Sequence, residues 1–94
     1  MARYRRRDAV EARLSDDVRA EGRTFSADLI AKRATGIEGY RMTVAFLERE
    51  GEGHFFVELE PAPTREEAQR RAEELQNDVH SLRELLSDQL TGSA

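Results

Sequence analysis

Five glutamates within thirteen residues form one group of side chains in this sequence that could do chemistry. Paired carboxylates can act as the acid and the base in general acid–base catalysis. The surrounding residues, however, alternate between apolar and polar, and charges on an exposed strand discourage pairing with other molecules. We therefore interpret the cluster as a solvated acidic edge and predict that the protein is not an enzyme. Its members are Glu48, Glu50, Glu52, Glu58 and Glu60.

Metal and nucleophile chemistry also find little support. His54 and His80 lie in different predicted elements, and no spacing of His, Asp and Glu is typical of a metal site. The absence of cysteine excludes a thiolate zinc site and a cysteine nucleophile. The serines lie outside any nucleophile-elbow motif, and the glycines form no phosphate-binding loop. We predict neither a metal nor a cofactor.

The first seven residues offer a different chemistry, because four of them are arginines. Such an arm can lie along phosphates while a tyrosine stacks on a base, so we keep nucleic-acid binding as the alternative function. The body is acidic, with a net charge of -4 for the whole chain, and it would repel phosphates. We expect residues 1–7 to be a flexible basic tail, with these residues as the nucleic-acid contacts: Arg3, Tyr4, Arg5, Arg6 and Arg7.

Hydrophobic spacing predicts one α+β domain over residues 8–91. An apolar residue every fourth position between Val10 and Val18 predicts a first helix over residues 8–21. Alternation from Tyr40 to Glu60 predicts a β-hairpin that turns at residues 51–53. Residues 24–36 fit either a strand or a helix; we favour the strand. The predicted core is thus a small antiparallel sheet, a three-stranded meander within an α-β-β-β-α order.

The segment from Thr64 to Leu90 predicts one long helix packed on this sheet. Thr64 and Glu67 make a capping box, and apolar residues follow at alternating spacings of four and three. At ~1.5 Å per residue the helix would be about 40 Å long, whereas an eight-residue strand spans about 27 Å. The second half of the helix would therefore overhang the sheet.

The overhang predicts self-association. The apolar side chains of the overhang could be covered in three ways: by the first helix, by a bend near Asn77 and Asp78 that folds the end of the helix back, or by a second copy of the chain. We favour the second copy, because a two-fold pairing would cover every apolar side chain and is the commonest oligomer symmetry. The predicted dimer interface is Val79, Leu82, Leu86 and Leu90.

The second face of the sheet would also carry apolar side chains, namely Ile30, Leu47 and Phe56. These need cover from the first helix or from a partner. A chain of 94 residues buries only ~60–68% of its unfolded surface, so a partner would help to stabilise it. We predict a non-catalytic, homodimeric protein-interaction or adaptor module. No apolar run approaches the ~18 residues of a membrane span, so we expect a cytoplasmic protein that does not contact membranes.

Two resemblances bear on the alternative function. The predicted order of elements is similar to that of double-stranded-RNA-binding domains. Residues 39–75 resemble the arm-binding domains of phage-type integrases, through Thr64-Arg65-Glu66-Glu67-Ala68 at the start of the last helix. Both resemblances imply nucleic-acid binding. The sequence departs from both, because its last helix opens with Glu66 and Glu67 and its hairpin is acidic.

Overall fold

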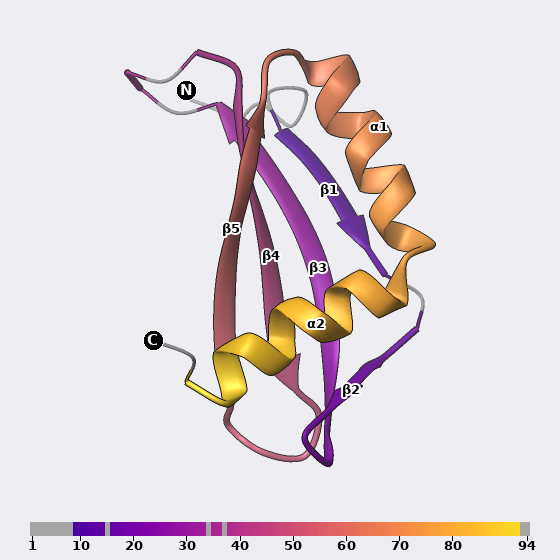
Figure 1. Ribbon diagram of the computed structural model, residues 1–94. Helices are drawn as coiled ribbons and strands as arrows, with labels where there is room; N and C mark the ends of the chain where they lie inside the picture. Colours follow the sequence, from indigo (N-terminus) through magenta and orange to yellow (C-terminus); the bar gives the residue numbers. More distant parts are fainter. Residues whose placement is uncertain (1–8, 15, 34, 37, 93–94) are drawn as a thin grey trace, which may run out of the picture.

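The computed structural model describes residues 9–14, 16–33, 35–36 and 38–92, and it consists of one antiparallel sheet with two helices on one face (Figure 1). The α+β class is confirmed. The sheet has five strands and not the predicted three, because two further strands precede the meander; their order is β1-β3-β4-β5, with β2 also paired to β3. The elements are β1 (Ala9–Arg13), β2 (Val18–Ala20), β3 (Arg23–Arg33), β4 (Tyr40–Glu48), β5 (His54–Ala62), α1 (Arg65–Gln76) and α2 (Val79–Leu90).

The prediction of a first helix is wrong, because its residues form β1 and β2. Val10 pairs with Ala31 of β3, and Val18 pairs with Phe25 further along the same strand. A spacing of four residues returns to the same side in a helix and equally in a strand, whose side chains alternate with a period of two. Val10 and Val18 are buried in the core, but their spacing did not identify the element.

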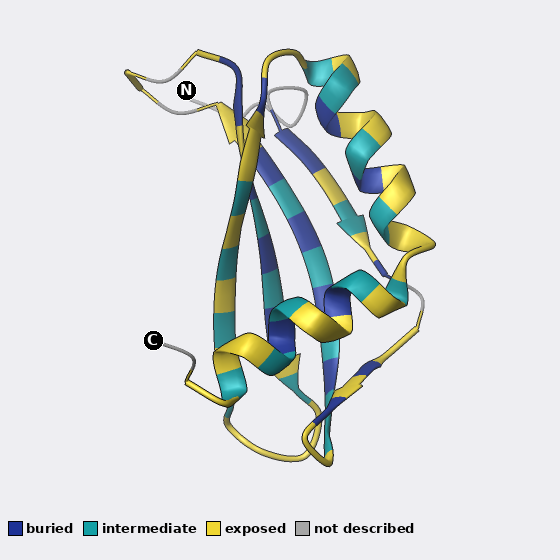
Figure 2. Cartoon of the chain, viewed as in Figure 1, coloured by how far each residue is buried: buried dark blue, intermediate teal, exposed yellow. Residues whose placement is uncertain are grey.

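The predicted hairpin is confirmed in β4 and β5, and residues 23–33 form the strand that we favoured. The ladder places Leu29 opposite Val44, and Val44 opposite Val57. Every second residue is buried from Phe25 to Ala31 in β3 and from Tyr40 to Phe46 in β4, on the side that faces the helices (Figure 2). The largest fully buried side chains are Phe25, Phe46, Leu29, Met42, Leu82, Leu86, Val18 and Val44.

The predicted single long helix is two helices with a sharp change of direction between them. Thr64 caps α1 as expected, accepting a hydrogen bond from the backbone N–H of Glu67. Asn77 ends α1, and Asp78 caps α2 by accepting from the N–H of Ser81. Asn and Asp side chains compete for backbone groups inside helices and are favoured at caps, so this pair breaks the helix.

The break removes the predicted overhang. Helix α1 lies beside β1, while α2 crosses the sheet between the β2 side and the β5 side (Figure 1). Leu82 and Leu86 are fully buried in the core of their own chain, and Val79 and Leu90 are half-buried against it. Of the three covers considered for these side chains, the fold uses the bend near Asn77 and Asp78.

Candidate functional site

The face of the sheet opposite the helices is not covered by any described element. We call it the open face and define it by the regularly paired strand positions that alternate with the buried ones: Glu11, Arg13, Arg19, Thr24, Ser26, Asp28, Ile30, Lys32, Arg41, Thr43, Ala45, Leu47, His54, Phe56 and Glu58. The expectation that this face carries apolar side chains in need of cover therefore agrees with the fold.

The most exposed apolar side chains of the open face lie on β4 and β5. Phe56 is 60% exposed and Leu47 is 51% exposed, and these are the exposed large apolar side chains among the described residues. Phe56 lies opposite Ala45 and Leu47 lies opposite His54. The rings of His54 and Phe56 are 4.6 Å apart between centroids, at 41°. Phe56 and Leu47 are thus large apolar side chains that the fold leaves uncovered on this face.

The charge of the open face differs from that of the remaining surface. Its four basic and three acidic side chains give a net charge of +1, whereas the other described residues sum to -8. Two of its charge pairs are internal, because Arg13 lies 3.3 Å from Asp28 and Arg41 lies 3.0 Å from Glu58. The five hairpin glutamates therefore do not make this face acidic.

The outer edge of β5 ends the sheet, since β5 pairs with β4 alone among the described strands. The N–H of Glu48 donates to the carbonyl of Gly53. In an antiparallel pair every second residue bonds to the same neighbouring strand, so this bond identifies the residues of β5 whose backbone groups point toward β4. By alternation these are Phe55, Val57 and Leu59. The N–H and C=O groups of the residues between them point outward along a free edge.

Toward the C-terminal end of β5 the backbone groups of this edge are no longer free. The guanidinium of Arg71 on α1 donates to the backbone carbonyls of Glu60 and Pro61, at 3.0 and 3.1 Å. Proline itself has no N–H to offer. The free part of the edge is therefore residues 54–58, which we call the β5 edge.

The inner side of β5 is also incompletely covered. Phe55, Val57 and Leu59 face the helices but are only half-buried. Their neighbours on β4, such as Phe46 and Val44, are fully buried. The β5 edge thus has partly exposed apolar side chains on both of its faces.

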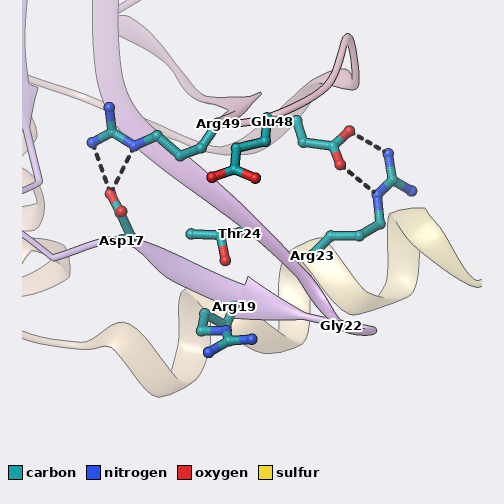
Figure 3. A pocket seen from close by; sticks show the side chains of 8 residues that line it. Asp17, Arg19, Gly22, Arg23, Thr24, Glu48 and Arg49 are labelled. Carbon is teal, nitrogen blue, oxygen red and sulfur yellow. Dashed lines mark hydrogen bonds and ion pairs between the residues drawn. The ribbon is translucent and has the colours of Figure 1, made fainter.

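A hollow of about 570 Å³ lies at the far end of the sheet, where the β2–β3 and β4–β5 turns meet (Figure 3). Glu48 accepts two hydrogen bonds from the guanidinium of Arg23, at 2.7 and 3.1 Å, and one from the N–H of Gly53. Arg49 donates to the carboxylate of Asp17 at 2.8 and 3.2 Å. We call these contacts the turn clasp.

The arginine–carboxylate pairs of the turn clasp shift the pKa values of Glu48, Arg23 and Arg49. The hydrogen bond from Arg23 lowers the pKa of Glu48, and the same bond raises the pKa of Arg23. The bond to Asp17 likewise raises the pKa of Arg49. Both carboxylates are therefore engaged by an arginine, Glu48 by Arg23 and Asp17 by Arg49. These contacts join β3 to the end of β4 and the segment before β2 to the β4–β5 turn.

The other candidate side chains lie apart from one another. His54 is on β5, whereas His80 is on α2 and lies 3.4 Å from Glu84. The arginine arm, residues 1–7, falls outside the described residues. Within the described ranges, no three His, Asp or Glu side chains are grouped as metal ligands, and no helix is both long and apolar enough to cross a membrane.

Comparisons with known proteins leave the site to be interpreted from its own geometry. No protein-family model matches this chain, and no curated protein or solved structure is significantly similar to it. The sequence located Phe56 and Leu47 on the open face through their alternation. It contained no signal for the free edge of β5 or for the turn clasp, because both depend on contacts between distant segments.

Proposed function

We propose that this protein is a non-catalytic, homodimeric protein-interaction module whose second copy binds along the β5 side of the sheet. The observation that carries the proposal is the exposure of Phe56 and Leu47, 60% and 51%, beside the free edge of β5. Leu82 and Leu86 are buried within the chain, so the proposed dimer does not use the α2 surface that the sequence suggested.

Charge favours a second copy as the occupant. The surface outside the open face sums to -8 over the described residues, so two such surfaces would repel each other. The β5 edge carries one formally charged side chain, Glu58, which lies 3.0 Å from Arg41, so it can approach a second copy of itself with little repulsion. An apolar centre with a polar rim is also typical of protein interfaces.

The size of this edge is that of a weak dimer. The five residues of the β5 edge span about 17 Å, and a sheet with one helical layer is about 20 Å thick. A contact along this edge buries on the order of 350 Å² per copy. Two copies together bury ~700 Å², below the ~1,200 Å² of stable, specific interfaces, so we expect a dimer that forms at high protein concentration.

The proposal is tested by the solution mass of a variant. Phe56→Ser removes the exposed ring without emptying the core, so the variant should fold and sediment as a 10.7 kDa monomer at concentrations where the wild type is a dimer. Gln69→Ser, an exposed change on α1, is the matched control and should leave the dimer intact. An unchanged dimer in Phe56→Ser would contradict the proposal.

Nucleic-acid binding through the arginine arm is the second candidate, and one observation favours it. Ala9, which follows the arm closely, pairs with Lys32, and Lys32 pairs with Arg41. A hollow of about 270 Å³ at this corner is lined by Ile30, Lys32, Arg33, Arg41 and Thr43. Ala9, the first described residue, therefore lies beside a basic corner of the open face.

This second candidate predicts binding that depends on salt. Fluorescence anisotropy with single- and double-stranded DNA and RNA should show binding at ~50 mM salt that weakens steeply by ~200 mM. Changing Arg5, Arg6 and Arg7 to Ala should abolish it without affecting the fold. Absence of binding at the lower salt concentration would remove this candidate.

A further inference from the structure

We infer that the two copies join edge to edge, with β5 antiparallel to β5 of the second copy and Phe56 directly opposite Phe56 of the partner subunit. The inference rests on the proposed homodimer and specifies how it is built. The resulting sheet would run continuously through both copies. The alternative, stacking of the two open faces, would leave the β5 edge unpaired.

The backbone of the β5 edge supplies the first argument. His54, Phe56 and Glu58 direct their N–H and C=O groups away from β4, as the bond from Glu48 to Gly53 requires. A row of unpaired donors and acceptors on an edge strand is a template for another strand. Apolar side chains on both faces of this edge would be covered by the same pairing.

The end of the free edge limits the register. Arg71 occupies the carbonyls of Glu60 and Pro61, so pairing is confined to residues 54–58. The centre of that segment is Phe56. A two-fold axis through a pair of identical strands places the central residue opposite itself, and therefore His54 opposite the partner's Glu58.

The side chains are complementary in this register. On the open side the two Phe56 rings would meet at the axis, and aromatic cross-strand pairs are stabilising. His54 and the partner's Glu58 would form a polar pair, and symmetry repeats it on the other side of the axis. On the inner side Phe55 would lie opposite the partner's Val57.

Neighbouring registers fit less well. A shift toward the N-terminal end brings Glu58 opposite the partner's Glu52, and like charges directly opposite each other destabilise a pair. A shift toward the C-terminal end brings His54 opposite the partner's Glu60, whose carbonyl Arg71 already occupies. The register centred on Phe56 is the one that both ends of the edge permit.

Disulfide cross-linking between two different cysteine variants tests the register. The chain has no cysteine of its own, so any disulfide must join the introduced residues. In the inferred register His54→Cys and Glu58→Cys lie on directly opposed positions, with Cα atoms ~5.5 Å apart, within reach of a disulfide. Two His54→Cys chains would hold their cysteines about 14 Å apart. A mixture of the two variants should therefore form a covalent dimer, and either variant alone should not.

Amide exchange on the wild type tests the edge without any substitution. The amides of His54, Phe56 and Glu58 should exchange at least tenfold more slowly at high than at low protein concentration. Glu11 and Arg13, whose amides by the same alternation point outward from β1 at the opposite edge, are the control and should not change. A dimeric mass without protection at the three β5 amides would overturn the edge-to-edge inference and leave the proposed dimer standing. A monomeric mass at every concentration would overturn both.

Discussion

The guanidinium of Arg71 donates to the backbone carbonyl of Glu60 at 3.0 Å, and this contact ends the free edge of β5 at Glu58, four residues before the strand ends at Ala62. Arg71 is held in place by Glu67, 3.0 Å away on the same helix. A helix that covers one side of the sheet thus also decides how much of its edge is open. The account of the dimer depends on this relationship.

Arg71→Met should therefore change the register of the dimer. Methionine keeps the apolar stem but removes the donors to Glu60 and Pro61, so the edge becomes longer by one outward-facing residue. Cross-linking between His54→Cys and Glu60→Cys should appear in the Arg71→Met background. The same pair in chains that retain Arg71 is the control, and equal yields in both backgrounds would show that Arg71 does not limit the register.

Leu82→Ala should destabilise the monomer. Leu82 lies on α2 and its side chain is fully buried in the core. Truncating a buried leucine costs about 2–5 kcal/mol of unfolding free energy. Urea unfolding should show this loss, while the dissociation constant of the folded protein stays within twofold of the wild type. Leu90→Ala, at a half-buried position of the same helix, should cost less. A Leu82→Ala variant that is folded but monomeric would contradict the β5 interface and support the interface on α2 that the sequence predicted.

Glu67 should make the fold sensitive to acid. Hydrogen bonds from Arg70 and then Arg71 lower the pKa of Glu67 from 4.5 to about 2. Since the pKa is lower in the folded state, the stabilisation is fully present above pH 4.5 and is lost as the pH falls toward 2. In Glu67→Gln the urea midpoint should therefore fall less between pH 5 and pH 2 than in the wild type.

Glu66→Gln is the matched control for that measurement, because Glu66 is exposed and lies one position away. Its urea midpoint should follow the wild-type pH dependence. If Glu67→Gln and the wild type lose stability in parallel over this pH range, the arginines do not hold the carboxylate as described.

Glu48→Gln should loosen the turn clasp and leave the dimer unchanged. The amide cannot form the charged, two-point pair with Arg23, and it accepts the bond from the Gly53 N–H more weakly. Faster exchange of the Gly53 amide and a lower Tm are expected, with the same solution mass. Loss of the dimer in this variant would connect the turn clasp to the interface and contradict their separation.

Local patterns predicted the parts of this fold that depend on neighbouring residues. Alternation located the hairpin and the outward position of Phe56, and the capping box located the start of α1 at Thr64. The spacing between Val10 and Val18 is common to helices and strands, so it could not separate them. Asn77 and Asp78 are the residues at which the helix breaks. The apolar spacing continues through them, however, and favoured one helix.

The features that define the site could not be predicted in this way. Whether β5 is a central or an edge strand depends on residues 9–20 pairing with β3 at the far side of the sheet. The bonds from Arg71 to Glu60 and from Arg23 to Glu48 join segments that only the folded chain brings together. Their charges were visible in the sequence, but their partners were not.

Sedimentation equilibrium of the wild-type chain is the most direct test of the central claim. At concentrations rising to ~1 mM, a range that includes weak interfaces of this size, the account predicts a monomer–dimer equilibrium that approaches twice the 10.7 kDa chain mass. A mass of 10.7 kDa at every concentration would contradict it, because Phe56 and the β5 edge would then remain uncovered by a second copy.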